Sequence, residues 1–187
     1  MTYYDENAQS FIDSTLDLDM GELYKKFEAH LSPGASILDL GCGPGRDLKY
    51  FSATYKGSGL EPCHKLYEHA KNYTQCQVFE TTIQDFKPTE KYDGIWACAS
   101  LLHVPTSELP SVFLKLESML NDNGVIYVSF KLGNFEGDRN GRYFSDLTED
   151  SLTSLLTSTQ LKITESWITS DIRPGRESEK WLNVIIQ

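Results

Sequence analysis

Short apolar runs rich in β-branched residues alternate with helical patterns along almost the whole chain. This order is typical of βαβ units and predicts an α/β fold around a parallel sheet. We expect strands at Ser36–Leu40, Lys56–Leu60, Gln77–Glu80, Tyr92–Cys98, Val125–Phe130, Lys162–Thr169 and Trp181–Ile186. We expect helices at Met20–His30, Arg46–Tyr55, Cys63–Asn72, Leu109–Leu120 and Thr148–Ser158, the last with Thr148 as its N-cap.

The last two expected strands are joined only by a polar loop that contains Pro174 and Gly175. Because no crossover helix separates these strands, we expect them to pair antiparallel at one end of the sheet. No linker, repeat or low-complexity tract interrupts the pattern. We therefore predict one domain over residues 1–187, with an N-terminal helical segment at 1–33 and a core at 34–187.

The charge balance narrows the range of partners. The 187 residues include 27 acidic and 17 basic side chains, which gives a net charge of −10. Such a chain repels phosphate backbones, so we expect no nucleic acid partner. No apolar run approaches the ~20 residues of a membrane span, and the start lacks a signal-peptide pattern. We expect a cytoplasmic monomer or homodimer with no membrane partner.

The four cysteines stand apart in the sequence, with no CxxC pair and no matching histidine cluster. This spacing argues against a structural zinc site and against a disulfide framework. We therefore predict that the chain binds no metal.

A glycine-rich turn carries most of the functional information. Residues 37–47 read ILDLGCGPGRD, so a buried strand ends and three glycines then stand at alternate positions before a helix. Such glycines allow a tight turn and bring backbone N–H groups against a ligand, although the same turn can also be only a strand-to-helix connection. A dinucleotide fingerprint needs G-x-G-x-x-G, whereas Arg46 stands here where the third glycine belongs. The spacing favours a nucleoside without a pyrophosphate, and Glu61, at the end of the next strand, can accept hydrogen bonds from both ribose hydroxyls.

The turn together with GSGLEP at residues 57–62 resembles class I S-adenosylmethionine-dependent methyltransferases of small bacterial type, over nearly the whole chain. The resemblance implies a Rossmann-like, doubly wound sheet of seven strands, in the order 3-2-1-4-5-7-6 with strand 7 antiparallel. It also implies that the cofactor is S-adenosylmethionine. The cofactor-binding positions that it implies are Asp39, Gly41, Cys42 and Gly43 around the methionine part, Glu61 and Pro62 at the ribose, Gln84 and Asp85 in the third motif (TIQDF, 82–86), and Ala97 at the end of the fourth strand.

The methyl acceptor is harder to identify, because methyl transfer needs a base only when the acceptor must lose a proton. Residues 97–100 read ACAS and lack the Asn/Asp-Pro-Pro-aromatic motif of enzymes that methylate base amino groups, and the chain has no large recognition insertion. We therefore expect a small acceptor. Two alternatives stay open, namely a non-catalytic sensor or scaffold that binds the cofactor, and a methyltransferase of tRNA or protein.

Four of the five arginines fall in two loops, which we expect at the carboxyl edge of the sheet, where open α/β folds bind ligands. Arginines gathered there suit a carboxylate or phosphate, so we expect an anionic acceptor held by Arg142 and Arg173, whereas Arg139 and Arg176 complete the group. The alternative is that these arginines pair with nearby surface acids. We also select His103, which can orient or deprotonate the acceptor, or merely shape the pocket.

The N-terminal aromatics Tyr3, Tyr4 and Phe11 precede the first core helix. In many members of the family that the chain resembles, this segment folds over the cofactor as a lid, and closure would exclude water from the reaction. The alternative is a frayed tail whose aromatics pack on the outside of the sheet.

Overall fold

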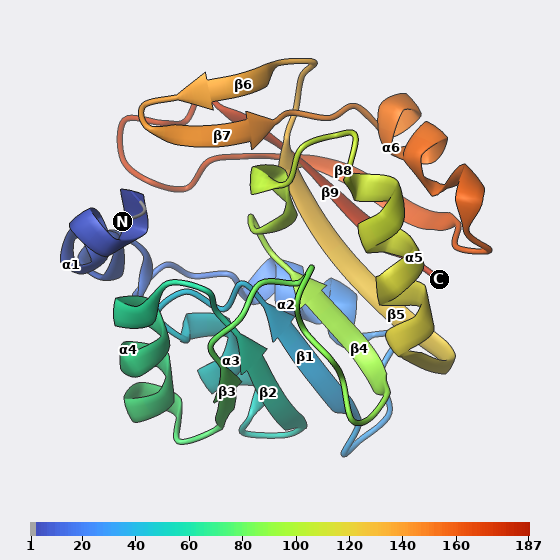
Figure 1. Cartoon of the computed structure of the whole chain (residues 1–187), viewed down its shortest axis with the longest axis horizontal. Coiled ribbons are helices and arrows are strands. Elements are labelled where there is room, and N and C mark those ends of the chain that lie inside the picture. The colour runs from blue at the N-terminus through green and yellow to red at the C-terminus, as the bar shows by residue number, and fades with distance from the viewer. Residues whose placement is uncertain (1–2) are drawn as a thin grey trace.

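The computed structural model of the chain describes residues 3–187. Its main sheet has the order β3-β2-β1-β4-β5-β9-β8 (Figure 1). The strands are β1 (Ser36–Leu40), β2 (Lys56–Leu60), β3 (Gln77–Phe79), β4 (Tyr92–Ala97), β5 (Leu120–Lys131), β8 (Ile163–Ser170) and β9 (Lys180–Ile186). Within residues 3–187, β9 is the strand of this sheet that runs opposite to the other six, pairing antiparallel with β5 and β8. Since β8 and β9 are the sixth and seventh strands of this sheet, the predicted order 3-2-1-4-5-7-6 is confirmed.

Both faces of the sheet are buried, which explains the near-continuous apolar strands. Along β5, Ile126 and Val128 point to one face, and Val125 and Tyr127 point to the other. Helices α5 (Leu109–Met119) and α6 (Glu149–Leu155) cover the first face, and α2 (Gly21–Glu28) and α3 (Arg46–Phe51) cover the second. Helix α4 (His64–Thr74) packs beside α3.

Most boundaries agree with the sequence prediction to within a few residues. Thr148 caps α6 as predicted, because its side chain accepts a hydrogen bond from the backbone N–H of Ser151. Helix α3 ends at Phe51, four residues earlier than predicted, since the chain turns tightly from there toward β2. Strand β5 begins at Leu120, earlier than predicted, because Leu120 pairs with Tyr92.

The sequence prediction gave no bounds for two parts of the structure, although it expected residues 1–33 to be helical. Helix α1 (Tyr3–Thr15) lies against α4, at the left of Figure 1. A hairpin of β6 (Glu136–Arg139) and β7 (Arg142–Ser145) forms a second sheet, which Figure 1 shows above β4 and β5. Its turn is Asn140-Gly141, both at positive φ, which is the strongest short hairpin signal in a sequence.

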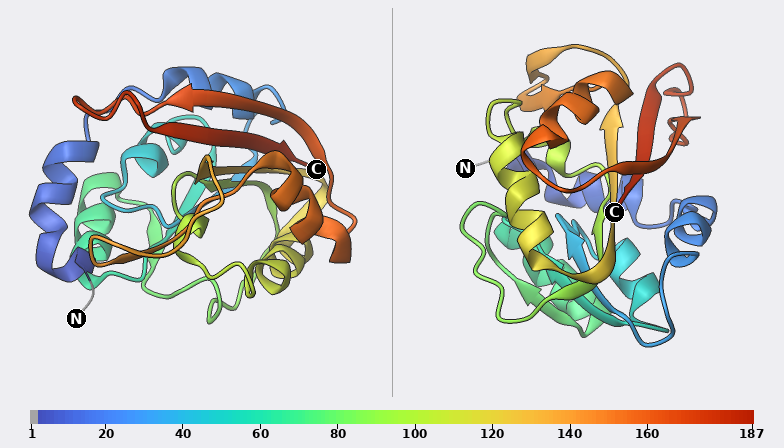
Figure 2. Two further views of the ribbon diagram at one scale, coloured as in Figure 1. Left: turned by 90° about the horizontal axis from the view of Figure 1, so that it is seen from above. Right: turned by 90° about the vertical axis from the view of Figure 1, so that its right-hand side faces the viewer.

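These additions meet at the carboxyl ends of the parallel strands. The hairpin contacts the short 3₁₀ helix η1 (Leu101–His103) that follows β4, and a second such helix, η2 (Leu156–Ser158), follows α6. Figure 2 shows the antiparallel pair β8–β9 running together along one side of the molecule. Within residues 3–187, no helix has the length and apolar character that crossing a bilayer requires.

Candidate functional site

A cavity of about 510 Å³ opens at the carboxyl ends of β1, β4 and β5. The glycine-rich turn, η1, β7 and the loop between β8 and β9 all contribute to its wall, as do α1 and the start of α2. The predicted site residues that line it are Gly41, Cys42, Gly43, His103, Arg142 and Arg173. The structure thus brings the glycine-rich turn and the three predicted acceptor residues to one cavity.

The glycines of the turn are required by close contacts. Gly41, Gly43 and Gly45 all have positive φ, at 72°, 55° and 94°. A Cβ on Gly41 would lie 2.5 Å from the Cβ of Ser100, and one on Gly45 would lie 3.1 Å from the backbone of Ala70 in α4. A Cβ on Gly43 would lie 3.3 Å from the ring of Phe11 in α1. Gly45 therefore allows the turn to pack against α4. Gly41 and Gly43 instead line the cavity with backbone atoms.

Glu61 fixes this turn through hydrogen bonds to its backbone. Its carboxylate accepts hydrogen bonds from the backbone N–H groups of Gly43, at 2.9 Å, and Cys63, at 2.8 Å. The residue is only 5% exposed. Burial raises the pKa of Glu61 to about 7, although the two backbone donors oppose this effect. Glu61 thus ties the end of β2 to the turn after β1.

Glu61 should make the protein less stable as the pH rises. Its pKa is raised from 4.5 to about 7 in the folded state, so the folded protein binds more protons than the unfolded chain between these values. The stabilisation that Glu61 contributes is then fully present below pH 4.5 and is lost up to pH 7, by up to about 3 kcal/mol. Urea unfolding across this range should show the slope in the wild type and a smaller slope in Glu61→Gln. Equal slopes would contradict the raised pKa.

Beneath the turn lies a buried charge cluster that sequence reasoning missed. Asp47 accepts hydrogen bonds from Tyr24 at 2.5 Å, from Trp96 Nε1 at 2.8 Å, and from Arg46 at 2.6 and 2.9 Å. Burial alone would raise the pKa of Asp47, but the Arg46 guanidinium and the hydrogen bonds hold it below its ordinary value. Arg46 also donates to the carbonyl of Thr15 in α1, at 3.1 Å. The only signal in the sequence was an arginine where a dinucleotide fingerprint has glycine.

Among residues 3–187, the buried side-chain polar atoms that lack a hydrogen-bond partner are Asp39 Oδ2, Ser100 Oγ and Arg142 Nε. Asp39 stands at the end of β1, two residues before Gly41, and Ser100 faces Gly41. Burial, and next the charge of Asp47, raises the pKa of Asp39 well above its ordinary range, which favours the protonated acid. Native proteins seldom leave such groups unpartnered except where a ligand binds. All three atoms belong to residues in or beside the cavity wall.

His103 is held between two tyrosines. Its Nδ1 donates to the backbone carbonyl of Tyr143, at 2.6 Å, and its Nε2 accepts from the hydroxyl of Tyr4 in α1, at 2.8 Å. Burial lowers the pKa of His103, and Arg142 adds to this effect. Burial also raises the pKa of Tyr4. The pair is therefore a neutral imidazole and a neutral phenol, which is the protonation state that a general base needs.

Arg142 differs from the other three loop arginines. Its guanidinium lies over the rings of Tyr3, at 4.7 Å, and Phe144, at 5.1 Å. The closest hydrogen bond runs from NH1 to the hydroxyl of Tyr4, at 3.5 Å, and Nε has no partner among the described residues. No ion pair joins Arg142 to a carboxylate within residues 3–187. Arg142 therefore lines the cavity with hydrogen-bonding capacity that no carboxylate of the described residues uses.

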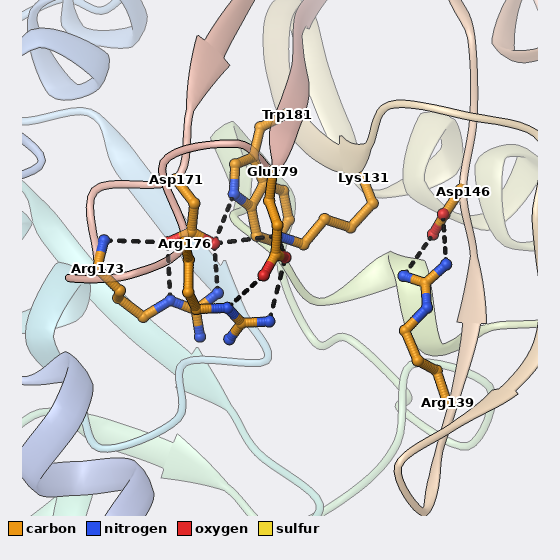
Figure 3. A network of polar contacts seen from close by, with 8 residues as sticks. All are labelled: Lys131, Arg139, Asp146, Asp171, Arg173, Arg176, Glu179 and Trp181. Atoms are coloured by element: carbon orange, nitrogen blue, oxygen red, sulfur yellow. Dashed lines mark hydrogen bonds and ion pairs between the residues drawn. The ribbon is translucent and has the colours of Figure 1, made fainter.

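The remaining arginines are paired with acids (Figure 3). Arg173 donates hydrogen bonds to Asp171 from Nε, at 2.9 Å, and from NH2, at 2.5 Å. Arg176 donates to Glu179 from the same two nitrogens. Burial would raise the pKa of Asp171, but Arg173 and the other donors hold it well below its ordinary value. Arg139 pairs with Asp146 away from this group. This is the pairing with nearby acids that the sequence left as an alternative.

Lys131, at the end of β5, is a cavity residue that sequence reasoning missed. It is 6% exposed and pairs with both Asp171, at 3.0 Å, and Glu179, at 2.5 Å. Its ammonium also lies 3.9 Å from the ring centre of Trp181 (Figure 3). A lysine after an apolar strand resembles an ordinary strand end, so no sequence signal marked it.

The other predicted cofactor positions do not line the cavity. Ala97 is fully buried at the end of β4, and Pro62 is exposed after Glu61. Gln84 and Asp85 are exposed on the loop after β3, where Gln84 donates to Glu108 and Asp85 accepts from the hydroxyl of Thr82. Across residues 3–187, no group of three or more histidine, cysteine, aspartate or glutamate side chains is placed to hold a metal ion.

Comparison with known proteins identifies relatives of the chain. Residues 8–165 match the sequence model of a family described as a methyltransferase domain. Trans-aconitate 2-methyltransferase from an Enterobacter species is 32% identical over 98 residues, which cover 50% of this chain and 38% of that protein. The chain thus matches less than half the length of this curated relative.

Two solved structures show the same fold at low sequence identity. An S-adenosylmethionine-dependent methyltransferase from Clostridium acetobutylicum has a TM-score of 0.75 and 13% identity, over 97% of this chain and 98% of that one. A Burkholderia thailandensis 1,6-didemethyltoxoflavin-N1-methyltransferase, solved with 1,6-didemethyltoxoflavin and S-adenosylhomocysteine bound, has a TM-score of 0.76 and 18% identity, over 98% and 82% of the two chains.

Proposed function

The chain belongs to the methyltransferase domain family, and we propose that it transfers a methyl group from S-adenosylmethionine to a small anionic molecule. Buried polar groups beside the glycine-rich turn support the choice of cofactor. Arg142, whose Nε has no partner within residues 3–187, supports an anionic acceptor. The relative that methylates trans-aconitate is in keeping with an anionic acceptor.

The residues at the turn fit this cofactor. Gly41 and Gly43 present backbone where a Cβ would fill the available space, and Asp39 Oδ2 and Ser100 Oγ offer hydrogen-bonding capacity beside them. We assign the methionine end of the cofactor to Asp39, Gly41, Cys42 and Gly43. We assign its ribose to Glu61 and Pro62 and its adenine to Gln84 and Asp85. We assign the end of β4, at Ala97, to the side of the transferring methyl group. When bound, S-adenosylmethionine supplies an electrophilic methyl group whose leaving group is a neutral thioether.

Glu61 would gain further hydrogen-bond partners on cofactor binding. Its carboxylate now accepts from the backbone N–H groups of Gly43 and Cys63, and each carboxylate oxygen can accept a further bond. The ribose hydroxyls would use this remaining capacity and favour the ionised form of the side chain.

The proposal of an anionic acceptor rests on the residues at the end of the cavity near His103 and Arg142. Arg142 is the cavity arginine whose N–H groups are not already used by a carboxylate within residues 3–187. An arginine edge of this kind binds a carboxylate or phosphate through parallel hydrogen bonds. Arg173 would contribute less than Arg142, since its N–H groups are bonded to the Asp171 carboxylate, which also offsets its charge. His103 would contact the acceptor beside Arg142.

Helix α1 would act as the lid. It supplies Tyr4 and Phe11 to the cavity wall and packs on α4 through Ala8 and Ile12. A helix so placed excludes water from the site, which strengthens the electrostatic contacts inside it. Residues 1 and 2 of the predicted lid segment lie outside the described residues.

Calorimetric titration with S-adenosylmethionine and S-adenosylhomocysteine, with NAD as the control, tests the cofactor. We expect binding of the first two and no binding of NAD. Absence of binding by folded, ligand-free protein would overturn the proposal. Binding without turnover on a broad panel of small carboxylates and phosphates would favour a sensor or scaffold instead.

Arg142→Leu should weaken acceptor binding and leave the cofactor in place. Loss of a charged hydrogen-bonding partner corresponds to about a 10- to 100-fold rise in KM for the anionic acceptor that the panel identifies. The affinity for S-adenosylhomocysteine should stay unchanged. The matched control is Arg176→Leu, since Arg176 also lines the cavity but is already bonded to Glu179. Equal effects of the two substitutions would remove Arg142 from the acceptor site.

A further inference from the structure

The hydroxyl of Tyr4 lies at the acceptor end of the cavity, between the two groups that we assign to the acceptor. It donates to His103 Nε2 at 2.8 Å and accepts from Arg142 NH1 at 3.5 Å. One oxygen of the chain itself therefore joins the base and the cation. Whatever replaces this hydroxyl must satisfy the same two neighbours.

The protonation pattern of His103 restricts what can bind there. Its Nδ1 lies 2.6 Å from the carbonyl oxygen of Tyr143, which can only accept, so the imidazole proton sits on Nδ1. Nε2 then presents a lone pair to the cavity. A group that faces it must donate a hydrogen bond, and a carboxylate oxygen would meet the lone pair without a proton between them.

Arg142 sets the opposite requirement. The rings of Tyr3 and Phe144 lie against its guanidinium, at 4.7 and 5.1 Å, so the N–H edge is the part left for a ligand. That edge can only donate, and its Nε has no partner among the described residues. A hydroxyl oxygen meets both requirements, because it accepts from Arg142 and donates to His103.

We propose that the phenol of Tyr4 is an internal stand-in for the acceptor, and that the reacting group of the acceptor is an acidic hydroxyl, as in a phenol or an enol. The inference rests on the proposed function, since it describes the acceptor of the same site. The acceptor displaces the Tyr4 hydroxyl and takes up both of its contacts. A carboxylate oxygen in the place of this hydroxyl would lack the proton that His103 Nε2 needs.

The proton transfer follows from this placement. The acceptor hydroxyl gives its proton to His103 Nε2, and the electron pair of the O–H bond stays on oxygen. That pair forms the bond to the methyl carbon as the carbon–sulfur bond breaks with its own pair left on sulfur. His103 becomes a cation beside Arg142 and returns the proton to solvent when the site opens.

Helix α1 has a feature that lets Tyr4 leave. Asn7, at φ −114° and ψ 15°, interrupts the helical geometry between the first turn and the remainder of α1. Beyond this kink, Ala8 and Ile12 are buried against Cys63 and Leu66. The first turn can move with Tyr4 while the rest of the helix stays packed, once Asp5 in that turn gives up its hydrogen bonds from Cys63 Sγ, at 3.3 Å, and Lys65 Nζ, at 2.7 Å.

Binding to protein loaded with S-adenosylhomocysteine tests the proposal without need of turnover. The probes are the three hydroxybenzoate isomers, each compared with the benzenedicarboxylate that carries a second carboxylate in place of the hydroxyl. Affinities come from ligand-observed NMR titration. We expect at least one hydroxybenzoate to bind about tenfold more tightly than its dicarboxylate counterpart. Failure of S-adenosylhomocysteine to bind would instead count against the proposed function.

Tyr4→Phe removes the stand-in hydroxyl and keeps the ring. We expect it to tighten the binding of that hydroxybenzoate about fivefold, because the ligand no longer competes with an internal hydrogen bond. Dicarboxylate binding should not change. The control is Tyr73→Phe, an exposed tyrosine on α4 outside the cavity. Weaker hydroxybenzoate binding in Tyr4→Phe would overturn the proposal, as would equal or tighter binding of the dicarboxylates, or no binding of any probe.

Discussion

Asp47→Ala should destabilise the protein by about 3–5 kcal/mol, because it leaves the buried guanidinium of Arg46 without its counter-charge. The substitution also removes the acceptor for Tyr24 and for the indole N–H of Trp96. Each of these donors is buried, so each loses a hydrogen bond that water does not replace. Asp47 therefore holds α2, α3 and β4 together under the glycine-rich turn.

Urea unfolding followed by tryptophan fluorescence measures this effect. The control is Asp122→Ala, which removes an exposed carboxylate before β5 enters the core and should change stability by less than about 0.5 kcal/mol. A loss below about 1 kcal/mol for Asp47→Ala would mean that Arg46 finds another partner or reaches solvent. The cluster would then not be the support of the turn.

Gly41→Ala should weaken S-adenosylhomocysteine binding by about 100-fold or more, because two costs act together. The residue has φ +72°, which a side chain disfavours, and its Cβ would lie 2.5 Å from the Cβ of Ser100. Ser100 cannot yield freely, since the 3₁₀ helix η1 begins at the next residue. The loop must therefore change shape, and the backbone groups that face the cofactor change with it.

A second glycine separates these two costs. Gly34 has φ +77°, and no described residue lies within 4 Å of a Cβ placed on it. Gly34→Ala should thus lower the melting temperature through backbone strain alone and leave the calorimetric affinity for S-adenosylhomocysteine unchanged. If Gly41→Ala bound this ligand as tightly as Gly34→Ala does, the turn would not be the cofactor cradle.

The sheet was predictable because its signals are local. Strand β1 and the turn after it are read directly from ILDLGCGPGRD, and the antiparallel end follows from the loop around Gly175. The β6–β7 hairpin carried an equally local signal in Asn140-Gly141, which sequence reasoning did not use. Helix α1 carried a weaker sequence signal, because its sequence is mostly polar and its burial comes from packing on α4.

The candidate site was less predictable from the sequence than the sheet. Arg142 and Arg173 look alike in the sequence, but Asp171 occupies the N–H groups of Arg173, whereas the hairpin carries Arg142 to Tyr3 and Phe144. Tyr4 meets His103, although 99 residues separate them. No pattern of spacing reports such a contact.

Residues close together in the chain were enough to predict the strands of the main sheet, the helices between them, the glycine-rich turn and the family. Tertiary packing was needed to show which charges stay available for a ligand and which nitrogen of His103 carries the proton. Hydrogen bonds and ion pairs use up a polar group once they form, and their partners here come from distant segments brought together by the packing of the sheet.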